Sequence, residues 1–139
     1  MIRATTVFRL DTTGVQRTAR SVLLLDGKPS GRVRGCRIDA QFEVGDGTEL
    51  AGYVALVSFD DMFSAIETVY FLDTLGRVRD RLTLGHATEQ GLISEITVDG
   101  PDVISFAFPT SRRHRLRVRC RTWMFGLRKR WLTLEPLPQ

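Results

Sequence analysis

The chain has 139 residues and a mass of 15.7 kDa, which is enough for one hydrophobic core. With 42% hydrophobic and 26% charged residues, its composition is that of a globular protein and excludes a disordered, collagenous or disulfide-rich class. The net charge of +4 divides unevenly, because residues 1–111 carry −4 and residues 112–139 carry +8. We therefore expect a basic C-terminal segment that can attract anionic partners.

Alternating apolar and polar residues, frequent β-branched and aromatic residues and regularly spaced turn signals are typical of an all-β chain. Short turns such as Asp26-Gly27 predict that consecutive strands are antiparallel neighbours. Gly35 is a candidate point of division within the first long stretch of strand-like sequence, residues 31–44. The predicted strands cover residues 3–10, 18–25, 31–44, 48–58, 67–73, 77–84, 92–98, 102–108, 113–123 and 128–135.

A meander of about 8–10 antiparallel strands tends to curl and close, and closure removes its unpaired edges. We therefore predict one β-barrel-like domain over residues 1–139, with a β-sandwich as the alternative. The strand count and the short hairpins look like the architecture of the lipocalin and fatty-acid-binding barrels. Because the Gly-x-Trp signature of lipocalins is missing from the first strand, no site residue is carried over from that resemblance.

At most one short helix is expected, near residues 60–67. Asp60 or Asp61 can serve as its N-cap, and Ser64 with Glu67 has the spacing of a local capping box. This role also accounts for the only adjacent pair of carboxylates in the chain.

The C-terminal hairpin is the most informative segment, because five arginines alternate with other residues from 113 to 122. Side chains i and i+2 share one face of a strand, so the arginines are expected on one face and Leu116 and Val118 on the other. The apolar residues of the return strand must share that second face. This condition predicts Leu116 opposite Leu134, Val118 opposite Leu132, Arg117 opposite Thr133 and Arg115 opposite Glu135. It also places Arg119 opposite Trp131, where the two can form a cation–π pair.

The arginine face is a candidate site for an anionic ligand or for nucleic acid, since arginine forks pair with phosphates and bases stack on tryptophan. The alternative is a solvated outer strand face, which the shorter rows Arg32/Arg34 and Arg77/Arg79/Arg81 favour. The candidate residues are Arg113, Arg115, Arg117, Arg119, Arg121, Trp123, Arg128, Arg130 and Trp131.

Sequence motifs for catalysis or metal binding are missing. The chain contains no Gly-x-Ser-x-Gly, no His-Glu-x-x-His and no glycine-rich phosphate loop, and Cys36 and Cys120 do not form a Cys-x-x-Cys pair. We expect no metal and no other cofactor. Asp39 and Glu43 could face one way along a strand with Gln41, and either carboxyl becomes a candidate acid or base if it is buried in a pocket.

These observations favour a cytoplasmic, non-catalytic binding module whose barrel cavity holds a small anionic or amphipathic ligand. One alternative is a nucleic-acid-binding protein that uses hairpin 113–130. The other is a small cyclase- or isomerase-type barrel enzyme that acts through one or two buried carboxylates. Residues 1–6 carry no apolar secretory stretch, and no apolar run is long enough to cross a bilayer, so no membrane span is expected. Homodimerisation through an exposed strand is compatible with this fold.

Overall fold

The computed structural model describes residues 1–14, 19–45, 48–60, 65–84, 93–108, 112–119 and 131–137. Within these segments the chain forms twelve strands and no helix. The strands are β1 (Ile2–Ala4), β2 (Phe8–Asp11), β3 (Arg20–Leu25), β4 (Lys28–Arg34), β5 (Arg37–Gly45), β6 (Leu50–Asp60), β7 (Ala65–Leu72), β8 (Val78–Leu84), β9 (Ser94–Gly100), β10 (Val103–Ala107), β11 (Arg113–Val118) and β12 (Leu132–Pro136).

The all-β prediction is confirmed, and each predicted segment overlaps an observed strand. Two of the segments are divided: residues 3–10 form β1 and β2, and residues 31–44 form β4 and β5, which separate near Gly35. The interpretation of Glu67 as part of a helical capping box is wrong. Glu67 lies inside β7 opposite Ser58 of β6, because the nearly continuous apolar run that follows it is buried on both faces of the sheet.

The strands form three antiparallel sheets. Their strand orders are β1-β5-β6-β7-β8, β12-β11-β10-β9 and β2-β3-β4. Within each sheet sequence neighbours pair, as the short turns predict, except that β1 pairs with β5. The consecutive strands β1 and β2, β4 and β5, and β8 and β9 belong to different sheets, so the single meander predicted from the sequence is divided at these three points. None of the three sheets closes on itself within the described residues, so the predicted barrel is not confirmed.

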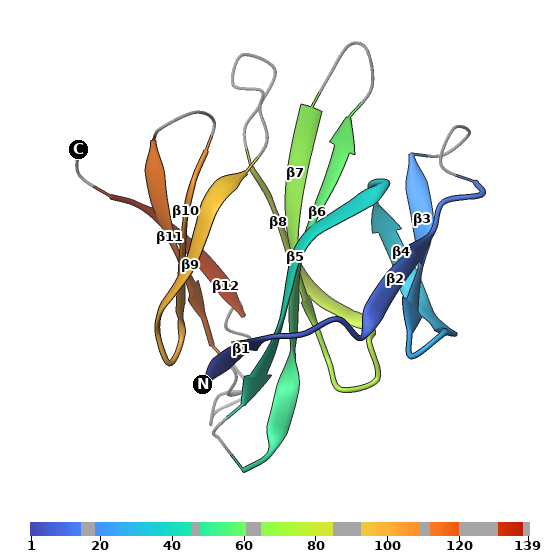
Figure 1. Cartoon of the computed structure of the whole chain (residues 1–139), viewed down its shortest axis with the longest axis horizontal. Coiled ribbons are helices and arrows are strands. Elements are labelled where there is room, and N and C mark those ends of the chain that lie inside the picture. The colour runs from blue at the N-terminus through green and yellow to red at the C-terminus, as the bar shows by residue number, and fades with distance from the viewer. Residues whose placement is uncertain are drawn as a thin grey trace, which may run out of the picture.

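The five-stranded sheet lies between the other two (Figure 1). Its residues Val54, Leu56 and Val69 pack in a core with the four-stranded sheet. The alternate residues Ala55 and Val57 pack in a second core with the three-stranded sheet. The central strands are therefore buried on both faces, which explains why their sequence is almost continuously apolar.

The chain passes between two sheets at Gly35. The amide of Gly35 donates to the Ala19 carbonyl at 2.9 Å, beside the three-stranded sheet, and the amide of Cys36 donates to the Ser58 carbonyl at 2.9 Å, in the central sheet. Gly35 has a φ of 141°, a conformation that residues with a side chain rarely adopt. One peptide thus links the two sheets, and a glycine is required there.

A second link is made by Gln41 of β5, whose side-chain amide forms hydrogen bonds with the main chain of β2 as a neighbouring strand would. Its Oε1 accepts from the Phe8 amide at 2.9 Å, and its Nε2 donates to the Phe8 carbonyl at 3.1 Å. The main chain enters the same junction just before β2, where the Thr5 amide donates to the Gln41 carbonyl at 3.1 Å.

Candidate functional site

The predicted register of the C-terminal hairpin is confirmed at the four described strand pairs. Leu116 lies opposite Leu134 and Val118 opposite Leu132, with the two arginine pairings as expected. The amide of Arg119 donates to the Trp131 carbonyl at 2.7 Å, which continues the same register by one residue. Leu116 and Val118 are buried in the core, so the described arginines of β11 lie on the outer face of the four-stranded sheet.

Acidic side chains neutralise much of this outer face. Arg113 pairs with Glu95 at 3.1 Å, and Arg117 pairs with Asp102 at 3.4 Å and with Glu135 at 3.9 Å. Asp99 adds another negative charge, and hydrogen bonds from the hydroxyl groups of Ser105 and Thr97 lower its pKa. The positive charge available to a ligand is therefore smaller than the row of arginines indicates.

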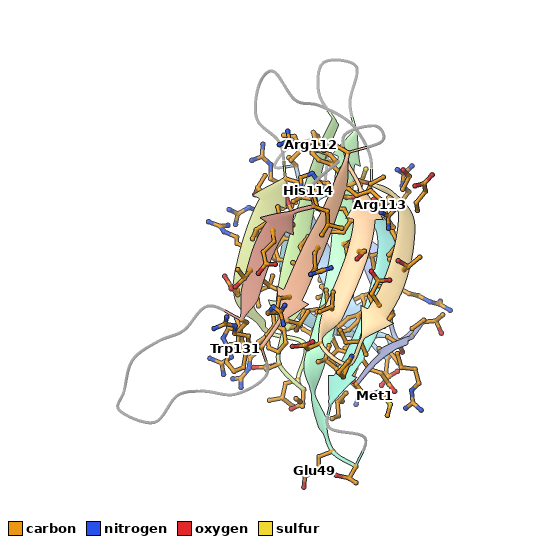
Figure 2. The ribbon with its side chains drawn as sticks, turned by 90° about the vertical axis from the view of Figure 1, so that its left-hand side faces the viewer. Met1, Glu49, Arg112, Arg113, His114 and Trp131 are labelled. Atoms are coloured by element: carbon orange, nitrogen blue, oxygen red, sulfur yellow. The ribbon has the colours of Figure 1, made fainter. Side chains whose placement is uncertain are left out.

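Trp131 does not share a face with the arginines, which corrects the predicted cation–π pair with Arg119. Its ring stacks on Phe71 of the central sheet, with ring centroids 4.7 Å apart and an interplanar angle of 3°. Trp131 precedes β12, so strand alternation does not fix the direction of its side chain. It lies at the opposite end of the four-stranded sheet from Arg113 and His114 (Figure 2). The candidates Arg121, Trp123, Arg128 and Arg130, like Cys120, lie outside the described residues.

The structure brings a different set of polar residues together, at one end of β5, β6 and β7. Arg37, Ser58 and Glu67 form a row across these strands, since Ser58 lies opposite Arg37 on one side and opposite Glu67 on the other. The ladder between β5 and β6 is irregular between Ile38 and Ala40, and Asp39 is the residue without a strand partner there. Such bulges re-aim side chains and are frequent beside functional sites.

The bulge turns Asp39 toward Glu67, away from the face on which Gln41 contacts the three-stranded sheet. Asp39 and Gln41 therefore do not face one way, as the simple alternation suggests. The Nε of Arg37 donates to Asp39 Oδ1 at 2.8 Å, and this hydrogen bond raises the pKa of Arg37. We call Arg37, Asp39, Ser58 and Glu67 the carboxyl centre.

Glu67 is fully buried, and Ser58 is 1% exposed. Burial raises the pKa of Glu67 to about 9, and its hydrogen bond with Asp39 and the charge of Asp39 raise it as well. The backbone of Ile93 and the charge of Arg37 act in the opposite direction. Glu67 is consequently protonated at neutral pH and can donate its proton to Asp39.

The carboxyl centre also holds most of the unsatisfied polar atoms of the described core. Without a shared proton, neither Asp39 Oδ2 nor either carboxyl oxygen of Glu67 has a hydrogen-bond partner, and Ser58 Oγ has none. The only other such atom in the described residues is Nδ1 of His114. Buried polar atoms without partners are rare in native proteins, and a bound water or ligand is a common explanation.

Sequence reasoning identified Asp39 as a candidate acid or base but missed Glu67 and Ser58. The available signal was a glutamate at the start of the apolar stretch of β7, where a charged residue is unexpected unless it is neutralised or paired. Its partner Asp39 is distant in the sequence, and only the pairing of β5, β6 and β7 brings the two carboxyl groups together.

A surface pocket of about 290 Å³ lies at the opposite end of β5, beside Arg3, Glu43 and Leu50. Arg3 and Glu43 form an ion pair with each other across β1 and β5, so the charges of these two side chains already balance each other. The described residues contain no group of three or more His, Cys, Asp or Glu side chains that could hold a metal ion. Nor do they contain a helix with the length and apolarity needed to cross a bilayer.

No family model, curated protein or solved structure matches this chain.

Proposed function

We propose that the chain is a single domain, residues 1–139, that binds a small, polar and electrically neutral ligand at the carboxyl centre. The observation that carries this proposal is the gathering of buried polar groups from Asp39, Ser58 and Glu67 at one place. The shared proton joins the two carboxyl groups, but Ser58 Oγ has no hydrogen-bond partner. A ligand with both a hydrogen-bond donor and an acceptor would pair with Ser58 Oγ and with the carboxyl pair. The surrounding core is apolar, so an amphipathic molecule fits better than a fully polar one.

The charges of the centre argue for a neutral ligand. Protonated Glu67 carries no charge, and the carboxylate of Asp39 is balanced by Arg37 at 2.8 Å. An anionic ligand, the class expected from the sequence, would meet the negative charge of Asp39 in a region of low dielectric. We therefore assign the anionic class to other surfaces of the molecule.

The cyclase- or isomerase-type enzyme is a second candidate, favoured by the same pair of carboxyl groups. A neutral acid beside an ionised carboxylate is the arrangement that acid–base catalysis uses, because the two groups can donate and accept protons at the same pH. Asp39 would act as the base and Glu67 as the acid.

Native mass spectrometry of the gently purified protein tests the binding proposal. We expect the wild type to retain additional mass and Glu67→Leu to lose it, because leucine provides no hydrogen bond. Thr68→Val is the matched control: Thr68 is a neighbouring buried polar residue of β7 whose side chain points to the other face of the sheet, so this variant should keep the ligand. Ser58→Ala provides a milder change that preserves packing, with an expected loss of about tenfold in affinity for one hydrogen bond.

A wild type of bare mass, or equal retention by Glu67→Leu and the wild type, would contradict binding at the carboxyl centre. The retained compound then distinguishes the two candidates. Incubated in D₂O, it should exchange a carbon-bound hydrogen with the wild type but not with Asp39→Asn if the protein is an isomerase-type enzyme. No exchange with either protein supports the binding module.

A further inference from the structure

The outer face of the three-stranded sheet carries several exposed arginines and a single carboxylate. Its inward residues, including Phe8, Leu23 and Val33, pack against the central sheet. The alternate residues point outward. They are Arg9 and Asp11 of β2, Arg20, Val22 and Leu24 of β3, and Arg32 and Arg34 of β4. We call this set the β2–β4 face.

The register of the sheet gathers like charges on this face. Arg20 lies directly opposite Arg34, and Val22 lies between Asp11 and Arg32. Arg32 and Arg34 are separated by about 6.6 Å along β4. Like charges that lie directly opposite each other in adjacent strands destabilise a sheet. An anion that lies over this face would reduce the repulsion between such charges.

Most arginines elsewhere in the described segments have acidic partners, whereas Arg115 and Arg119 form no ion pair. Arg77 and Arg79 both pair with Asp73 at 3.0 Å, and Arg113 and Arg117 pair with acidic residues on the four-stranded sheet. Among the described residues, Arg9, Arg32 and Arg34 have no acidic side chain within 4.0 Å. The one carboxylate on the face, Asp11, accepts hydrogen bonds from the amide and the hydroxyl of Thr13.

We propose that the β2–β4 face binds the phosphate backbone of a nucleic acid. Arg32 and Arg34 form a row along β4, with Arg20 beside Arg34 on β3, and a chain of phosphates presents charges at regular intervals to such a row. Arginine forks suit phosphate oxygens geometrically. The face carries no aromatic side chain, so base stacking is not available and binding is independent of sequence. This site is distinct from the carboxyl centre and from the C-terminal hairpin.

Fluorescence anisotropy with a labelled 20-base-pair DNA duplex, titrated between 50 and 200 mM NaCl, tests the proposal. We expect Arg32→Gln/Arg34→Gln to bind at least about tenfold more weakly than the wild type at 50 mM salt. The slope of log K against log salt should decrease by about two, because each phosphate contact contributes about 0.9. The matched control is Arg115→Gln/Arg119→Gln, in β11 and just after its end, which lowers the net charge by the same amount and should bind like the wild type.

The two double variants have the same net charge, so they distinguish binding at the β2–β4 face from binding through net positive charge. Equal losses in both double variants would assign the binding to net charge and overturn the proposal, as would a loss confined to the β11 variant. No binding by the wild type at 50 mM NaCl would also overturn it. A titration with polyglutamate completes the test: weaker binding than to DNA is expected, whereas equal affinity with the same loss in Arg32→Gln/Arg34→Gln would assign the face to an acidic protein.

Discussion

Glu67 shows how a single residue can have an ionisation state opposite to the one its type suggests. It is buried at the edge of an apolar core, opposite Ser58, and it forms a hydrogen bond with another carboxyl group, that of Asp39. In water its pKa would be 4.5, whereas in the folded protein its pKa is raised to about 9, chiefly by burial. The proton that it keeps allows two carboxyl groups to share a buried site.

This proton makes the stability of the protein depend on pH. Between pH 4.5 and about 9 the folded state holds a proton on Glu67 that the unfolded chain releases. The free energy of unfolding should therefore fall as the pH rises through this range, by at most about 1.4 kcal/mol per pH unit. Glu67→Gln stays neutral at every pH and should lack this fall. Urea denaturation of both proteins between pH 5 and 9 measures the difference.

The carboxylates of Asp11 and Asp99 do not interfere with the comparison of the wild type and Glu67→Gln. The pKa values of Asp11 and Asp99 are lowered by hydrogen bonds from Thr13 and Ser105 respectively, so their contributions to stability are lost only as the pH falls toward and below 3.8. If the two proteins gave parallel curves from pH 5 to 9, Glu67 would be ionised in the folded state and the assignment of a shared proton would be wrong.

At the scale of the element, β6 is distinguished by burial on both faces. Val54 contacts the core beneath the four-stranded sheet and Val57 the core beneath the three-stranded sheet, and both are fully buried. We expect Val54→Thr and Val57→Thr each to destabilise the protein by about 1–3 kcal/mol, since each buries a hydroxyl group. Val78→Thr on the exposed side of β8 is the control, with a change within about 0.5 kcal/mol.

The outcome for Val57 is the more informative one, because it reports on the three-stranded sheet. A neutral Val57→Thr variant, measured by chemical denaturation, would mean that this face of β6 is solvated. The central sheet would then be covered on one side only.

The elements were predictable where local patterns decide them. Alternation and turn chemistry located the strands apart from the division between β1 and β2, and the parity argument predicted the pairing of β11 with β12. Local patterns failed where distant strands decide the result. The direction of the Trp131 side chain depends on Phe71, and the carboxyl centre depends on a bulge in β5 and on the pairing of β6 with β7. Neither feature has a signature within one segment.

At the scale of the whole molecule, the junction at Gly35 holds two sheets in their relative positions. A Cβ atom there would lie 2.4 Å from Val57 Cγ1 and 2.9 Å from the Ser58 carbonyl oxygen, in a backbone conformation with a φ of 141°. We expect Gly35→Ala to destabilise the protein by about 2 kcal/mol or more, through both strain and steric overlap. Thermal or urea denaturation measures this change.

Gly100→Ala is the appropriate control for the junction. A Cβ atom at Gly100 would have no atom within 4 Å and no positive φ to oppose it, so a change within about 0.5 kcal/mol is expected. Equal effects of the two substitutions would show that the junction does not depend on glycine.

The pairing of β1 with β5 has a consequence for the order in which the chain assembles. The strands β5 to β8 pair with their sequence neighbours, so that each hairpin can form as soon as it is synthesised. The strand β1 is made earlier, yet Ile2 pairs with Val44, and closing a long loop is slower than closing a hairpin. During translation the first strand therefore remains without its partner until β5 has left the ribosome, and we expect it to be among the last to join its sheet.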